Sequence, residues 1–361
     1  MLQSSYIDLL ETANCHFAAE NLSRHAHYAT VQRVKISIII PVKPGGYVAA
    51  LEPLQRLAGD SPAYEVLIAE GNRPSRQRNR AAAAARGNIL YFLDDDALVQ
   101  ADALKRVTAA FADPAVAVVG GPSLTPATDT PFQKAIAWAL SSAFGGGAIR
   151  NRYRRYGQRR DTDDSELILC NLAFRRDVYL ANGGLDERLY PNEENELIDR
   201  LLASGARLLH DPDMYVTRSQ RPTYKAFIRQ MLTYGRGRAE QSLLARSLSF
   251  KAVIPALFVV YLLSIPFYTA FWYTLPACIY LLALLASVLT AAGGAGVPVA
   301  LRLPLMYPLL HCCYGCGFIV GLFLPRYRGG KDDTAPVALR RVTETGSGWQ
   351  DGNRVVPAAA R

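Results

Sequence analysis

Charged residues are missing from a long part of this sequence, and their absence decides the broad class of protein. The chain has a formal net charge of +9, yet residues 252–300 contain no aspartate, glutamate, lysine or arginine. Residues 303–325 lack them again. A membrane-spanning helix needs about 20 apolar residues. The pattern therefore predicts spans near 252–272 and 275–292, and a third after residue 303.

Cysteine is scarce, and no export signal is evident. The sequence has six cysteines, four of them within the apolar segments, which argues against a disulfide framework. The stretch HCCYGCG at 311–317 is typical of small residues packed between membrane helices, and a metal or redox site there is the weaker alternative. The first residues lack a basic start followed by an apolar core. We expect the large N-terminal part to remain in the cytoplasm.

Short apolar runs alternate with helical patterns before residue 122. The run KISIIIPV is rich in β-branched residues and is typical of a buried strand. Alternation of strands and helices predicts an α/β fold, with a mostly parallel sheet and helices on both faces. The expected strands are 35–42, 64–72, 88–96 and 116–122, and the expected helices lie near 47–58, 75–86 and 100–112.

Three of these strands end in polar or special residues: Pro41, Glu70 and the triplet Asp94, Asp95 and Asp96. In parallel sheets, ligands bind outside the carboxyl ends of the strands. Side chains alternate along an extended chain, so Asp94 and Asp96 are expected to share a ligand while Asp95 turns aside. A divalent cation with a nucleotide phosphate fits such carboxylates. A solvated turn or a helix N-cap is the alternative.

A second acidic cluster lies in LYPNEENELIDRLLASG. Its apolar residues recur at helical spacing, which predicts a helix over 193–204 that ends at Gly205. Glu193 and Glu194 then occupy the first turn. Acidic residues stabilise a helix N-terminus, and a carboxylate at this place can equally act as a general base.

These stretches occur in a particular order, and together they resemble the family 2 glycosyltransferases. The resemblance covers about 34–240 and includes VKISIIIPVK, EVLIAEGN, RQRNRAAAAARGNILYFLDDDALV and the segment from LAFRRDVYL to DPDMYV. It implies a nucleotide-diphosphosugar-binding domain of the GT-A type. It also implies transfer with inversion at the sugar carbon, through a transition state like that of glycoside hydrolysis.

The resemblance assigns roles to individual residues. Glu194 takes the position of the general base, with Glu193 as its rival. Asp96 and Asp94 are the metal ligands, for Mg²⁺ or Mn²⁺. The residues implied in binding the donor are Pro41, Glu70, Arg78, Asn79, Asp94, Asp95, Arg236 and Arg238.

Two positions depart from the family pattern. Ala69 stands where the family has the first residue of an acidic pair that recognises the base. Arg218 stands where the family often places a histidine that binds the metal. An arginine does not bind a metal ion, but it binds phosphate well.

Basic segments flank the predicted site. The stretch IRNRYRRYGQRRD is compatible with membrane attachment, with a solvated loop or with an acceptor site, and no nucleic-acid-binding fold accompanies it. The stretch FIRQMLTYGRGRAEQ resembles the same region of succinoglycan-type exopolysaccharide glycosyltransferases. It lacks a Gln-x-x-Arg-Trp motif, which argues against a processive synthase.

The sequence therefore predicts four parts: an N-terminal helical extension at 1–33, a cytoplasmic GT-A domain at 34–245, a membrane region of two to three helices at 246–325, and a basic, disordered tail at 326–361. We expect an inverting transferase of the inner membrane that uses a UDP-type nucleotide sugar as its donor. We expect it not to bind nucleic acid. Its expected acceptor is a lipid-linked saccharide or polyprenyl phosphate, in exopolysaccharide or cell-envelope glycan synthesis.

Other functions are weaker alternatives. They are a catalytically inactive membrane scaffold, a polyprenyl-phosphate sugar synthase and a sugar nucleotidyltransferase. A nucleotidyltransferase is expected to have a Gly-x-Gly-Thr-Arg-like loop after the first strand, and the segment PVKPGGYVAAL does not contain one. The membrane orientation contains a conflict. Arginines before the first span and in the tail both indicate the cytoplasmic side, but three full spans would separate them.

Overall fold

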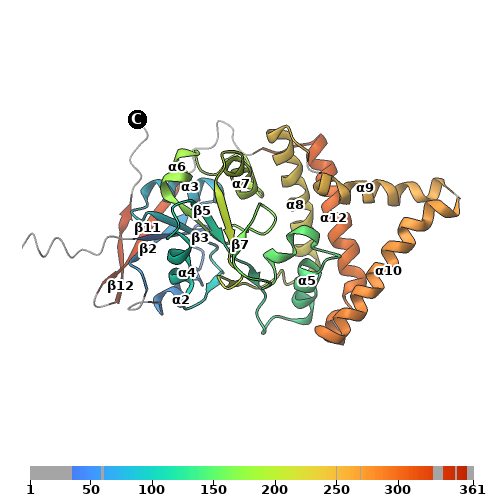
Figure 1. Cartoon of the computed structure of the whole chain (residues 1–361), viewed down its shortest axis with the longest axis horizontal. Coiled ribbons are helices and arrows are strands. Elements are labelled where there is room, and N and C mark those ends of the chain that lie inside the picture. The colour runs from blue at the N-terminus through green and yellow to red at the C-terminus, as the bar shows by residue number, and fades with distance from the viewer. Residues whose placement is uncertain are drawn as a thin grey trace, which may run out of the picture. The chain divides into compact units, whose positions relative to one another are not determined.

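A nine-stranded mixed sheet forms the centre of the part of the chain that the computed structural model describes, which is residues 35–57, 61–248, 250–268, 270–327, 336–345 and 348–355 (Figure 1). The strand order is β12-β11-β2-β1-β3-β8-β5-β9-β7, and a second sheet has the order β4-β10-β6. The predicted extension at 1–33 lies outside the described residues.

The strands and helices have the following bounds. The strands are β1 Ile36–Val42, β2 Tyr64–Glu70, β3 Ile89–Leu93, β4 Leu98–Val99, β5 Val116–Gly120, β6 Ser123–Leu124, β7 Arg160–Asp161, β8 Asn171–Arg175, β9 Arg207–His210, β10 Val216–Thr217, β11 Ala338–Thr345 and β12 Gly348–Val355. The helices are α2 Leu51–Gln55, α3 Pro74–Ala84, α4 Ala103–Ala110, α5 Pro131–Ser141, η1 Gly147–Arg152, α6 Arg176–Ala181, α7 Glu193–Ala203, α8 Tyr224–Ala245, α9 Phe250–Ser264, η2 Ile265–Phe267, α10 Phe271–Gly294, α11 Val297–Ala300 and α12 Leu303–Phe323.

The predicted α/β fold is confirmed, but the sheet is mixed. Strands β2, β1 and β3 are parallel, as strand–helix alternation requires. Strand β8 then enters antiparallel between β3 and β5, and β11 pairs antiparallel with the edge of β2. These later strands reach the sheet from loops and from the tail, without a crossover helix, so the alternation in the first third of the chain did not predict them.

Two hydrophobic cores cover the two faces of the sheet. Side chains of β1 alternate between them: Ile38 packs in one core with Leu54 and Val107, and Ile39 packs in the other with Leu197. Each fully buried aliphatic side chain of this kind contributes about 1.5–3 kcal/mol. Helices α2 and α4 cover the first face, and α3, α6 and α7 cover the second.

The C-terminal tail differs from its prediction. Instead of being disordered throughout, it contributes β11, which pairs along β2 from Ala338↔Glu70 to Thr343↔Glu65. Arg341 forms an ion pair with the fully buried Glu65, and Ser37 donates a hydrogen bond to the same carboxylate over 2.6 Å. A buried carboxylate requires such partners. The tail's basic composition hid this role, because the acidic partner lies far away in the sequence.

Among the described residues, three helices are long and apolar enough to span a membrane: Phe250–Phe267, Phe271–Gly294 and Leu303–Phe323. Helix α12 packs along α8, whereas α9 and α10 extend away from that pair (Figure 1). The α8–α12 contact is backbone to backbone. A Cβ atom at Gly235 would lie 2.0 Å from the carbonyl oxygen of Tyr314, and one at Gly317 would lie 2.1 Å from that of Leu232.

Candidate active site

The small sheet places Arg218 opposite the aspartate triplet. Strand β4 follows Asp96 after one residue and pairs with β10 through Val99↔Val216. Arg218 comes directly after β10, and its backbone N–H donates to the carbonyl of Leu124 over 2.8 Å. The backbone on both sides of the site is therefore fixed by strand pairing.

One guanidinium bridges the two outer aspartates. Arg218 Nε lies 2.6 Å from Asp96 Oδ1, and its Nη1 lies 3.1 Å from Asp94 Oδ2. Burial raises the pKa of Asp94, but the charges of Arg218 and Arg78 lower it by more than burial raises it, so its pKa lies below the usual range. For Asp95, burial and the neighbouring aspartate charges raise the pKa. The outer pair thus shares a cationic partner.

Arg78 lies behind these carboxylates. Its Nη2 lies 2.7 Å from Asp94 Oδ1, and its Nη1 lies 3.3 Å from Glu193 Oε1. Its side chain is only 5% exposed. This placement differs from the predicted donor contact: Arg78 joins the first acidic cluster to the second from inside the protein. Arg78 makes both contacts from a buried position.

The side chain of Asn79 is also engaged by other residues of the protein. Its amide nitrogen donates to the carbonyl of Leu185 and to Glu187, and its amide oxygen accepts from the hydroxyl of Tyr179. A Cβ atom at Gly184, whose φ is +69°, would lie 2.6 Å from that oxygen. Asn79 therefore anchors the GGLDE segment, which is again different from the predicted contact with the donor.

The two glutamates at the start of α7 have different environments. Glu193 is buried on Arg78. Glu194 is half-buried, and among the described residues none forms a hydrogen bond or ion pair with its carboxylate. The charge of Glu194 acts on Tyr234, which lines a cavity together with Arg218. Of the two glutamates, Glu194 is therefore the one whose carboxylate is free to accept a proton from a bound molecule.

Burial and the adjacent Glu194 charge raise the pKa of Glu193 to about 8, despite the opposing charge of Arg78. Its ordinary value is 4.5, so the folded state holds a proton that the unfolded state releases between these values. Stability from this group is present below about pH 4.5 and is lost as the pH rises towards 8.

Glu193→Gln, which stays neutral, should lack this loss. Its thermal midpoint in detergent, relative to the wild type, is expected to rise steadily between pH 5 and pH 8. Buffers of matched ionic strength keep screening constant. A difference that does not change with pH would contradict the raised pKa.

The predicted donor residues of β1 and β2 lie at the strand ends. Pro41 pairs with Ala69, and the half-buried Glu70 ends β2. Sequence reasoning missed Gln77, whose side-chain amide donates to the carbonyls of Val42 and Ala69 and so joins the two ends. A glutamine on the buried face of α3 was the available signal.

Arg236 and Arg238, the predicted diphosphate contacts on α8, have other partners. Arg236 lies 3.6 Å from Glu240, and Arg238 lies 3.1 Å from Asp164. The structure therefore does not bring them to the aspartate triplet. The helical register of α8 turns Gln230 and Tyr234 to the Arg218 cavity instead.

Part of the basic stretch after α5 is paired within the protein. Arg152 is buried and donates to Asn195 over 2.7 Å. Arg159 pairs with Asp211 over 2.7 Å, and Arg160 pairs with Glu166 over 2.6 Å. Residues 155–159 are nonetheless exposed, as expected of a solvated loop. The acidic partners lie up to about fifty positions away, so composition alone did not reveal them.

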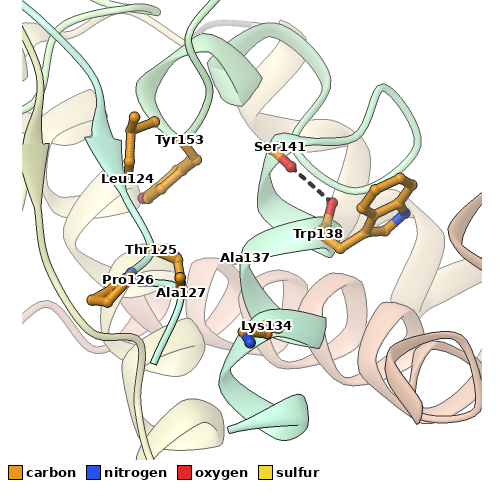
Figure 2. Close-up of a pocket in the computed structure, with 9 residues that line it drawn as sticks. All are labelled: Leu124, Thr125, Pro126, Ala127, Lys134, Ala137, Trp138, Ser141 and Tyr153. Atoms are coloured by element: carbon orange, nitrogen blue, oxygen red, sulfur yellow. Dashed lines mark hydrogen bonds between the residues drawn. The ribbon is translucent and has the colours of Figure 1, made fainter. Parts of the chain in front are cut away.

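Two cavities adjoin the site. The smaller one is lined by Arg218, Gln230 and Tyr234, and Gln230 Oε1 is buried without a hydrogen-bond partner among the described residues. The larger one, about 300 Å³, lies between α5 and the segment from Leu124 to Ala127 (Figure 2). Tyr153 lines both. Figure 2 shows the Trp138 ring pointing away from Leu124, and it reaches Gly294 of α10.

The donor set fits the expected metal poorly. Within the described residues no group of three or more histidine, cysteine, aspartate or glutamate side chains could hold a metal ion. Asp94 and Asp96, the predicted ligands, are both engaged by the Arg218 cation. A divalent ion between them would have to displace that guanidinium, and a positive charge beside it would oppose binding.

Comparisons with known proteins show what part of the domain is similar to. The model of the family "Glycosyl transferase family 2" matches residues 46–181. The pre-mycofactocin glycosyltransferase of Mycobacterium tuberculosis is 28% identical over 162 residues, which are 45% of this chain and 33% of the relative. The chain thus spans about a third of the length of the curated relatives it matches.

Solved structures of glycosyltransferases are also similar. The mannosyltransferase PcManGT from Pyrobaculum calidifontis, in complex with GDP-Man and Mn²⁺, has a TM-score of 0.42 at 15% identity, over 86% of this chain and 96% of that one. TarS 1-349 of S. aureus with UDP-GlcNAc has a TM-score of 0.41 at 13% identity, over 84% and 99%.

Residues 46–181 are therefore similar to a glycosyltransferase family 2 domain. The described sheet is the GT-A-like fold expected of it. The Arg218 bridge is a departure from the metal site that the family resemblance implies at Asp94 and Asp96.

Proposed function

We propose that this chain is an inverting glycosyltransferase that moves a sugar from a UDP-type nucleotide donor to a hydroxyl of a lipid-linked saccharide at the membrane surface. The observation that carries the proposal is the arrangement of the two acidic clusters. Arg78 links Asp94 to Glu193 inside the protein, and the neighbouring Glu194 carboxylate has no hydrogen-bond or ion-pair partner among the described residues.

Glu194 would take the proton of the acceptor hydroxyl as its oxygen attacks the anomeric carbon. The bond from that carbon to the diphosphate breaks, and its electron pair leaves with the nucleoside diphosphate. Attack opposite the leaving group inverts the carbon. General base catalysis of this kind contributes about 10²–10⁴-fold. No step passes through a metal ion, because the expected ligands Asp94 and Asp96 are held by Arg218.

Donor turnover tests this proposal directly. Detergent-purified protein is incubated with a panel of nucleotide sugars and a bacterial lipid extract, and released nucleoside diphosphate is measured. We expect release from one donor that depends on the lipid. A folded protein that neither binds nor cleaves any donor would support the inactive scaffold instead.

The larger cavity is the proposed place of the acceptor. It adjoins the Arg218 cavity through Tyr153, and its wall α5 packs against α11 and α12 of the apolar region. Lys134 lies on its lining and supplies a positive charge for a lipid phosphate. A lipid-linked saccharide joins an apolar chain, a phosphate and a hydroxyl, which matches this sequence of surfaces.

Ala137→Trp should fill this cavity, because Ala137 lines it from α5. The expected result is a higher KM for the lipid acceptor with an unchanged KM for the donor. Ala143→Trp, an exposed position just after α5, is the matched control and should leave both values unchanged. Equal acceptor KM values in the two variants would argue against this cavity as the acceptor site.

The membrane arrangement follows from the tail. Strand β11 pairs with β2 of the same sheet, so both lie on one side of the bilayer. Residues 326–333 of the connecting segment carry several charges, which oppose passage through hydrocarbon. This pairing supports an even number of crossing helices, and so two crossings in place of three.

The two crossing helices are proposed to be α9 and α10. Buried residues make up 17% and 6% of their apolar windows, against 39% for α12, which lies along the charged helix α8. The stretch Phe250–Phe267 is roughly 27 Å long at 1.5 Å per residue, close to the hydrocarbon thickness of about 30 Å. Tyr268 and Trp272 at the turn fit the far interface, where aromatic residues gather.

Labelling of single cysteines in a cysteine-free background tests this arrangement. A membrane-impermeant maleimide should label Tyr268→Cys in intact spheroplasts. Leu301→Cys and Leu324→Cys, at the two ends of α12, should react only after the membrane is permeabilised. Labelling of Leu324→Cys from outside would mean three crossings and would separate β11 from β2.

A further inference from the structure

We propose that the guanidinium of Arg218 replaces the divalent cation at the Asp94–Asp96 pair, so that this protein binds a nucleoside diphosphate without metal. This inference rests on the proposed glycosyl transfer. It concerns the ion that holds the diphosphate, which the family match leaves open. Its premise is the bridge from one guanidinium to both carboxylates.

The bridge occupies the place that a metal would need. A bound Mg²⁺ lies about 2.0–2.1 Å from its carboxylate oxygens. The guanidinium nitrogens of Arg218 already lie 2.6 Å and 3.1 Å from one oxygen of each aspartate. A dication between Asp94 and Asp96 would stand next to a fixed positive charge, so the two cations exclude each other.

Arg218 is built into this position. Its backbone N–H donates to the carbonyl of Leu124 in β6, and its side chain is 24% exposed. Burial favours the neutral form, but the Asp94 charge outweighs it, so the pKa of Arg218 lies well above its usual value. The side chain is therefore a permanent cation in a defined orientation.

The same guanidinium retains donors for a phosphate. An arginine has five N–H groups in a planar fork that matches phosphate oxygens. Arg218 Nε and Nη1 contact the aspartates, and Nη2 forms no hydrogen bond with another described residue. Arg218 and Arg221 both line the smaller cavity. Two cations thus face the space next to the carboxylates, as binding of a diphosphate dianion requires.

The experiment compares nucleotide and metal binding in full-length, detergent-purified protein. Isothermal titration measures the affinity for UDP, GDP, ADP and CDP in turn, once with EDTA and once with Mn²⁺. We expect the wild type to bind one of them equally well in both media. Electron paramagnetic resonance of Mn²⁺ should show no bound ion, with or without the nucleotide.

Arg218→His should convert the site to one that binds a metal ion. Histidine is a metal ligand, and loss of the guanidinium releases the oxygens of Asp94 and Asp96. The variant's nucleotide affinity in EDTA is expected to fall about ten- to a hundredfold, the cost of losing a charged hydrogen bond, and Mn²⁺ should restore it. Arg218→Lys keeps the cation and should remain independent of metal, with weaker binding. Arg155→His is the control, because Arg155 pairs with Asp213 on the surface, and it should behave as the wild type.

The outcomes separate the two proposals. Wild-type nucleotide binding that requires Mn²⁺ and disappears with EDTA would overturn the role of Arg218 while leaving glycosyl transfer intact. A folded wild type that binds no nucleotide in either medium would overturn glycosyl transfer, and the role of Arg218 with it. Thermal midpoints verify that each variant is folded. If Arg218→His does not fold, the nucleotide binding of Arg218→Lys in EDTA tests the role of Arg218.

Discussion

Glu194→Gln is expected to lower transfer to a hydroxyl acceptor by about 10²–10⁴-fold, with nucleotide binding unchanged. Glutamine keeps the size of the side chain but cannot accept the proton from the acceptor. Because the Glu194 carboxylate has no ion-pair partner in the described chain, its replacement should leave the fold intact. Single-turnover sugar transfer measures the first effect, and titration with the nucleotide that the wild type selects measures the second.

Two comparisons make this result specific. Glu193→Gln keeps a neutral side chain at a buried position whose carboxyl has its pKa raised to about 8, so it should reduce transfer much less. The acceptor class gives the second comparison. A phosphate acceptor has its second pKa near 6 and needs no base, so unchanged turnover of Glu194→Gln with a polyprenyl phosphate would identify a polyprenyl-phosphate sugar synthase.

The parts that could be predicted from sequence are those that local pattern determines. The strand before the triplet, β3, consists of five buried apolar residues, and alternation along the chain placed Asp94 and Asp96 on one side of it. The helix with Glu193 at its first position was likewise visible from its spacing. The GT-A-like fold followed from such elements in order, supported by the family resemblance.

The parts that could not be predicted depend on partners distant in the chain. Arg78 and Asn79 are adjacent to motif positions, but their contacts with Glu193 and Leu185 come from segments more than a hundred residues later. Arg341 similarly meets Glu65 across most of the chain. A motif assigns a residue to a site, whereas tertiary packing decides whether it faces the ligand or supports the residues that do.

Arg78→Met is expected to destabilise the protein by about 3–5 kcal/mol, the usual cost of removing one partner from a buried ion pair. It would remove the cation from one face of Asp94 and a hydrogen-bond donor from the Glu193 carboxyl. Urea titration of the detergent-solubilised protein, followed by tryptophan fluorescence, measures the loss. Arg80→Met, on the same helix but without an ion-pair partner in the described chain, is the control and should change stability little.

The double variant Arg78→Met with Glu193→Met distinguishes stability from function. Replacing both members of a buried pair by apolar side chains is often neutral, so the double variant should be more stable than Arg78→Met alone. Transfer activity should remain low in both variants, because Asp94 keeps its contact with Arg218 but has lost its contact with Arg78. Recovery of activity together with stability would mean that Arg78 matters only for folding. If stability returns and activity does not, the Asp94–Arg78–Glu193 chain holds the reacting geometry, and the two acidic clusters act as one site.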